Sequence, residues 1–144
     1  MRIRDAWWLA CVPFLSASPA HAGKPLQTSL QAIHADPALL GRKLSLDACM
    51  AIPLSANPTS PNDEVVLYPC GTRTSEEMLR SGILGKLASR HVAKPFNDAG
   101  ISFDGEVGAT FVGTLSKVEA GVDGPDAYFV LTIEQAIAPY ERKR

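Results

Sequence analysis

Beyond residue 22 the sequence lacks a second long hydrophobic run, a polybasic stretch and any motif with the spacing of a catalytic or metal site. Without another hydrophobic run, we expect no membrane insertion of this part of the chain. A formal net charge of −1 argues against the dense positive surface by which nucleic-acid-binding proteins displace counterions, so no nucleic acid is expected as a partner. These absences leave a small soluble domain as the expected class.

The first 22 residues have the layout of a secretory signal peptide. Arg2 and Arg4 provide positive charge, and a mostly apolar run follows over Ala6–Ala17. Residues 20–22, Ala-His-Ala, place small side chains at the two positions that a signal peptidase reads. A membrane anchor is the alternative, but the run is shorter than the about 20 residues that span a bilayer. We expect export to the periplasm or the medium, with a mature chain of 122 residues, 144 less 22.

The sequence contains three cysteines, of which Cys11 lies within the leader. Lipid acylation of Cys11 is an alternative to its loss with the signal peptide. In an oxidising compartment Cys49 and Cys70 are expected to form a disulfide, which in the loop-entropy model stabilises the fold by roughly 3 kcal/mol. Two free thiols remain the alternative, although neither cysteine lies in a C-x-x-C pair or beside an activating histidine.

Alternating apolar and polar residues predict β-strands along the chain. The pattern is longest over Arg42–Ile52, and loop-forming residues over Pro53–Asp63 separate it from the next strand. Gly113 predicts a bulge or a tight bend inside one of the later strands. The other strands are expected at Glu64–Tyr68, Ile101–Phe103, Glu106–Ala120 and Ala127–Ile137, with a hairpin loop at Gly121–Asp126.

Helical periodicity replaces this alternation over Thr72–Arg90, where Leu79, Ile83, Leu84 and Leu87 recur at helical spacing. Thr74 or Ser75 is the expected N-cap. The glycines at positions 82 and 85 weaken a helix by about 1 kcal/mol each, which close packing against a sheet would explain. A short helical turn is also expected over Pro37–Leu40, capped by Asp36 and ended by Gly41.

This order of elements predicts a mainly β protein with one helix: a five-stranded, OB-fold-like Greek-key barrel with a capping α-helix. The helix would plug one end of the barrel between the third and fourth strands. We expect a signal peptide at 1–22, an N-terminal extension at 23–38 that begins with a flexible stretch, the barrel domain at 39–138, and a charged C-terminal tail at 139–144.

Two stretches of the sequence resemble OB-fold proteins. Leu40–Cys49 is similar to the leucine, glycine, basic residue and alternating strand with which many such proteins open. Ala109–Leu115 resembles a later strand of the same class. In pattern the chain most resembles small exported bacterial OB-fold proteins of unknown function over Leu40–Ile137, and this resemblance implies no catalytic residue.

Reactive chemistry has little support in the sequence. His91, Asp98 and Asp104 could hold a metal ion after folding and serve a small metal-dependent hydrolase, but surface residues and turn chemistry explain them better. No G-x-S-x-G motif is present, and a bridged cysteine is no nucleophile. We therefore expect no catalytic residue, no metal and no cofactor.

A binding role is the leading hypothesis, with a protein or an envelope polysaccharide as the ligand. Lys86, Arg90, His91 and Lys94 form a basic cluster for an acidic partner, although favourable charge at a helix C-terminus explains them as well. One strand face mixes aromatic, aliphatic and hydroxyl groups and is a second candidate surface. A secreted inhibitor or immunity protein against a toxin or hydrolase, with 53–63 as its inserting loop, is the alternative. The candidate strand face comprises Tyr68, Thr110, Val112, Thr114, Tyr128 and Val130.

Overall fold

The computed structural model describes residues 24–51, 64–119, 121–122 and 126–143. The predicted signal peptide and the predicted loop at 53–63 lie outside these residues, as does half of the predicted hairpin loop, 123–125. No helix in these ranges is long and apolar enough to cross a membrane. The elements are β1 Leu26–Thr28, α1 Leu30–Ala35, η3 Pro37–Leu39, β2 Lys43–Ala51, β3 Glu64–Tyr68, α2 Ser75–Ser81, β4 Ile83–Leu87, η4 Arg90–Ala93, α3 Lys94–Asp98, β5 Glu106–Val118 and β6 Tyr128–Arg142.

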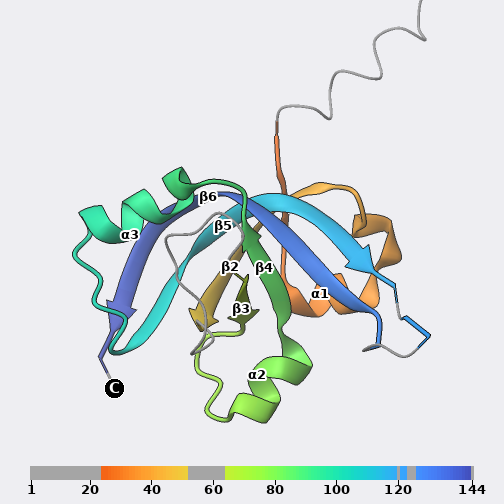
Figure 1. Ribbon diagram of the computed structural model, residues 1–144, viewed down its shortest axis with the longest axis horizontal. Coiled ribbons are helices and arrows are strands. Elements are labelled where there is room, and N and C mark those ends of the chain that lie inside the picture. Colours follow the sequence, from red (N-terminus) through yellow and green to blue (C-terminus); the bar gives the residue numbers. More distant parts are fainter. Residues whose placement is uncertain (1–23, 52–63, 120, 123–125, 144) are drawn as a thin grey trace, which may run out of the picture.

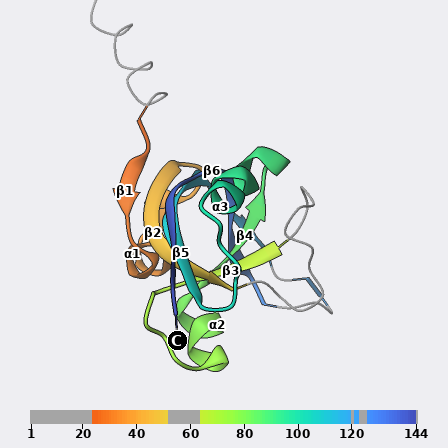
Figure 2. The same ribbon diagram turned by 90° about the vertical axis from the view of Figure 1, so that its left-hand side faces the viewer.

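Five strands form a closed barrel, as the sequence predicts (Figures 1 and 2). The hydrogen-bonded order is β2-β3-β4-β6-β5, and β5 pairs with β2 to close the ring. β4 and β6 run parallel, whereas the other barrel pairs are antiparallel. This closed five-stranded order is that of an OB-fold-like barrel.

Alternation along each strand places one set of side chains in the barrel interior. On β2, Leu44 and Leu46 are fully buried, and on β6 so are Leu131 and Ile133. Gly113 lies at a register shift between β5 and β6, which confirms the predicted bulge. A Cβ atom there would lie 2.1 Å from the Thr132 carbonyl oxygen, so only glycine fits this close approach.

The barrel is covered at both ends by short helices, with α3 toward one end and α1 toward the other (Figure 1). Val92 of η4 and Phe96 of α3 enter the hydrophobic core between the third and fourth barrel strands. Leu30 and Ile33 of α1 belong to the same core. A helical cap therefore lies between the third and fourth barrel strands, as predicted. Residues 90–98 form this cap, whereas the predicted segment was Thr72–Arg90.

The prediction of one helix over Thr72–Arg90 is wrong. α2 begins after the Thr74 N-cap and ends at Gly82, and Ile83–Leu87 is strand β4 between β3 and β6. A Cβ atom on Gly82 would lie 2.3 Å from the Leu67 carbonyl oxygen, and one on Gly85 would lie 2.8 Å from the Ile133 side chain. Both glycines serve close packing, as expected, but within the barrel wall rather than beneath a helix.

Three further expectations fail locally. The stretch expected to be flexible forms β1, which pairs in parallel with β2. Ile101–Phe103 is not a strand, because Phe103 has a φ of 64°, outside the extended region. β6 continues to Arg142 past the expected end of the barrel domain, because an irregularity in its pairing with β5 accommodates Pro139.

Candidate functional site

A groove of about 350 Å³ lies where β4 and β6 begin. β4 and β6 pair from Leu84 and Val130 onward, and the groove lies on the outer face beside the residues just before this pairing. We call it the β3–β4 groove. Its lining comes from α1, β3, α2, β4 and the start of β6: His34, Val66, Leu79, Gly82, Ile83, Leu84, Ala127, Tyr128 and Phe129.

The short helix α2 builds one wall of the groove. The Thr74 side chain accepts a hydrogen bond from the Glu77 N–H, which starts the helix, and Gly82 ends it. Packing of Gly82 against β3 holds α2 close to the barrel. Leu79 thereby remains 68% exposed beside the groove, instead of joining the core as its helical spacing predicted.

His34 fixes the opposite side of the groove. Its Nε2 atom lies 3.0 Å from the Gly82 carbonyl oxygen, where it donates a hydrogen bond. Its ring meets the Phe129 ring edge-on, with centroids 5.5 Å apart. Lys117 lies over the same phenyl ring at 5.7 Å. Through these contacts His34 joins α1 to Gly82, the residue before β4, and to Phe129 at the start of β6. The groove therefore has a defined shape.

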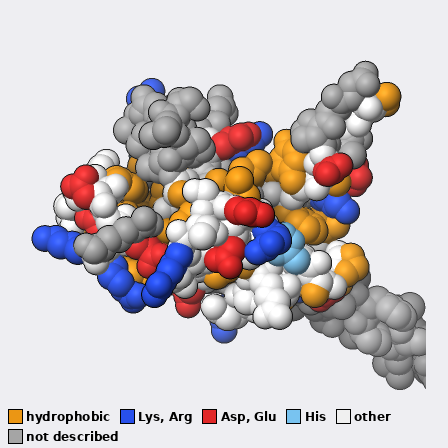
Figure 3. Space-filling model, turned by 90° about the horizontal axis from the view of Figure 1, so that it is seen from below, with side chains coloured by type: hydrophobic (Ala, Val, Ile, Leu, Met, Phe, Trp, Pro, Cys, Tyr) orange, Lys and Arg blue, Asp and Glu red, His pale blue; other side chains and the backbone are white. Residues whose placement is uncertain are grey.

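The groove is mainly apolar, and no Lys, Arg, Asp or Glu belongs to its lining among the described residues. On the neighbouring part of β3 and β4, Glu64 and Lys86 form an ion pair with charged atoms 3.7 Å apart. Both side chains are nearly half exposed, so this pair contributes little stability. In Figure 3, exposed hydrophobic side chains lie beside a histidine on the right-hand part of the face shown.

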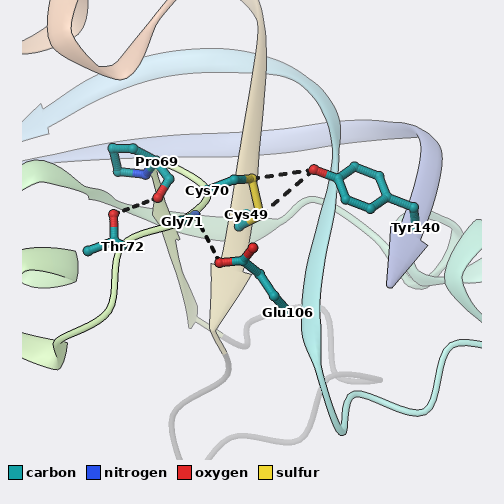
Figure 4. Close-up of a disulfide and its surroundings, with 7 residues drawn as sticks. All are labelled: Cys49, Pro69, Cys70, Gly71, Thr72, Glu106 and Tyr140. Carbon is teal, nitrogen blue, oxygen red and sulfur yellow. Dashed lines mark hydrogen bonds between the residues drawn. A yellow bond between two sulfur atoms is a disulfide. The ribbon is translucent and has the colours of Figure 1, made fainter. Parts of the chain in front are cut away.

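A disulfide joins Cys49 and Cys70, as the sequence predicts (Figure 4). It links β2 to the turn after β3, with Cα atoms 5.0 Å apart. The Tyr140 hydroxyl lies 4.0 Å from the Cys49 sulfur and 3.5 Å from the Cys70 sulfur. In the same turn the Gly71 N–H donates to the buried Glu106 carboxylate at 3.0 Å. The end of the barrel opposite α1 is therefore held by a covalent bond and several polar contacts.

The predicted basic cluster does not lie on one helix. Lys86 lies on β4 and pairs with Glu64, whereas Arg90 and His91 belong to η4. Lys94 starts α3 and forms an ion pair with Asp98 at 2.7 Å. Because β4 ends before Arg90, the expected helical i,i+4 relation of Lys86 and Arg90 does not exist.

The predicted strand face is only partly accessible. Tyr68 is 2% exposed, and Val112 and Val130 are also buried. Thr110 and Thr114 are half-buried. Tyr128, which is half-buried, belongs to the β3–β4 groove, so it is the predicted ligand residue that the structure brings into this candidate site.

The residues of the hypothetical metal site are not brought together. His91, Asp98 and Asp104 lie on η4, on α3 and in the segment before β5. In the part of the chain that the structure describes, no three His, Cys, Asp or Glu side chains are grouped so as to hold a metal ion.

The chain is a small OB-fold-like barrel protein with a groove over its second and third barrel strands. Its sequence matches no model of a protein family and no curated protein. Among solved structures it is similar to the aspartyl-tRNA synthetase from Entamoeba histolytica, with 13% identity and a TM-score of 0.43. That likeness covers 92% of this chain and 25% of the synthetase, so the chain spans about a quarter of that protein. At this TM-score the likeness says nothing about activity.

Proposed function

We propose that this protein is an exported, non-catalytic binding domain whose β3–β4 groove takes an extended apolar segment of a protein ligand. The disulfide supports export, because disulfides persist mainly in oxidising compartments. The position of the groove supports binding, because OB-fold barrels bind ligands on the face of their second and third strands and at the loop between their last two strands. In this chain those features are β3, β4 and the segment that leads into β6.

The observation that carries the proposal is an unpaired strand edge beside apolar side chains. β6 pairs with β5 from Tyr128 but with β4 only from Val130. No strand among the described residues pairs with the other edge of β6 at Tyr128 and Phe129. An extended peptide can add to such an edge through its backbone and place alternate side chains in the adjacent hollow.

The chemistry of the lining favours a protein over a polysaccharide. Sugars need several hydrogen-bonding groups, whereas Val66, Leu79 and Leu84 offer only aliphatic surface. His34, a titratable side chain of the groove, already uses Nε2 on the Gly82 carbonyl. Apolar peptide side chains fit this surface better, because each buried CH₂ group contributes about 0.8 kcal/mol.

A displayed library of random peptides tests the proposal. We expect the protein to enrich peptides with apolar residues at alternate positions, and Leu79→Asp to weaken their binding at least about tenfold by placing a charge in an apolar contact. Ile137→Asp is the matched control, because Ile137 is a 43% exposed aliphatic residue on β6 outside the groove lining. It should leave binding unchanged.

Two results would overturn the proposal. One is enrichment of no peptide, or of peptides that bind Leu79→Asp as tightly as the unaltered protein. The other is retention of envelope polysaccharide that Leu79→Asp abolishes, which would assign the groove to a glycan.

A further inference from the structure

We infer a second binding site, for a phosphate group, in a basic hollow at the disulfide end of the barrel. The hollow measures about 570 Å³ and lies away from the β3–β4 groove, with which it shares no lining residue. On the left of Figure 3, Lys and Arg side chains gather around acidic ones. The lining of the hollow is Gly71, Thr72, Arg73, Glu106, Arg142 and Lys143.

The charges of the hollow favour an anion with two negative charges. Three cationic side chains face one carboxylate, which leaves a formal charge of +2. Among the described residues, no carboxylate lies within ion-pair distance of Arg73, Arg142 or Lys143. Guanidinium groups match phosphate oxygens in geometry and bind them through paired hydrogen bonds.

Glu106 is turned away from the cation that would neutralise it. Glu106 and Arg142 are direct partners across β5 and β6, a position in which opposite charges often pair. The Glu106 carboxylate instead accepts the Gly71 N–H at 3.0 Å, and Gly71 adopts a φ of 92° in this turn. The Arg142 guanidinium thus has no ion-pair partner among the described residues and is available to a ligand.

Both segments that carry the cations are fixed before any ligand arrives. The turn before Arg73 is held by the disulfide and by the Thr72 hydroxyl, which donates to the Pro69 carbonyl at 2.6 Å (Figure 4). Arg142 ends β6, where its neighbour Glu141 accepts the Gly105 N–H at 3.0 Å. Such preorganisation lowers the entropic cost of binding.

Titration with inorganic phosphate, followed by amide chemical shifts in NMR, tests the site. We expect shifts concentrated at residues 71–73 and 142–143. Arg142→Gln and Arg73→Gln should each weaken binding about tenfold, the effect of losing a charged hydrogen bond. Arg42→Gln removes an exposed arginine outside the hollow and should have no effect. Glucose 6-phosphate serves as a second probe: tighter binding than inorganic phosphate assigns the site to sugar phosphates, and equal binding assigns it to the free ion.

Glu106→Gln provides a test in the opposite direction. The substitution retains an oxygen that can accept the Gly71 N–H but removes the opposing negative charge, so phosphate should bind several times more tightly. The inference fails if phosphate shifts are spread over the whole surface, if Arg42→Gln matches Arg142→Gln, or if Glu106→Gln weakens binding while the melting temperature is unchanged. Peptide binding in the groove is measured separately, so either proposal can fail without the other.

Discussion

Loss of the Cys49–Cys70 disulfide should destabilise the protein by an amount that follows from its position in the chain. The bridge joins residues 21 positions apart, and for a loop of this size the chain-entropy relation gives about 3 kcal/mol at 25 °C. In a domain of this length that corresponds to a fall in melting temperature of roughly 10 °C. Because Cys49 is buried and Cys70 is exposed, Cys49→Ala combined with Cys70→Ser replaces each cysteine by a residue suited to its environment.

Urea unfolding followed by circular dichroism measures this effect. The double variant should lose about 3 kcal/mol, and its m-value should rise because its unfolded chain is less compact. The reduced form of the unaltered protein keeps both sulfur atoms and loses only the cross-link, so it should lose a similar amount. A loss below about 1 kcal/mol in both would refute the view that the bridge acts on the unfolded chain.

Three further predictions concern packing and pH. Phe96→Ala should cost about 3–5 kcal/mol in urea unfolding, because the ring fills the α3 end of the core; a cost near zero would show that α3 is not a structural cap. Gly85→Ala should lower the melting temperature, because the added methyl would lie 2.8 Å from Ile133, and an unchanged temperature would contradict this packing. The N–H of Gly105, and to a lesser extent Ser102, lowers the pKa of Glu141 below 4.5, although partial desolvation opposes this. The stability that Glu141 contributes is therefore present above pH 4.5 and is lost as the pH falls. The difference in free energy of unfolding between the unaltered protein and Glu141→Gln should shrink in acid. A difference that grows below pH 4.5 would contradict this sign.

The sequence predicts the strands whose two faces differ, and it misses the short strand β4, whose middle residue is a glycine. Lys43–Ala51 and Glu64–Tyr68 alternate clearly and fold as expected. In β4 the inward positions are Ile83, Gly85 and Leu87. Glycine contributes no hydrophobic signal at the middle position, so the remaining apolar residues match helical spacing instead.

Most of the groove could not be predicted from the sequence, for another reason. Tyr128 was found through strand alternation, whereas Leu79 was assigned to the core by its helical spacing and no local pattern marks His34 as a groove residue. The lining comes from three separate parts of the chain, around His34, over 66–84 and over 127–129, and the fold of the barrel brings them together. The disulfide was predictable, because only two of the three cysteines lie outside the predicted signal peptide and they allow a single pairing.

The place of β6 between β4 and β5 has a consequence for how the molecule assembles. β6 pairs with β4 on one side and with β5 on the other, and both of these strands are synthesised before it. The barrel therefore cannot close until Tyr128–Arg142 has been synthesised. A nascent polypeptide that lacks this segment leaves one edge of β4 and one edge of β5 unpaired. Closure of the barrel therefore requires the strand that is synthesised after the other four.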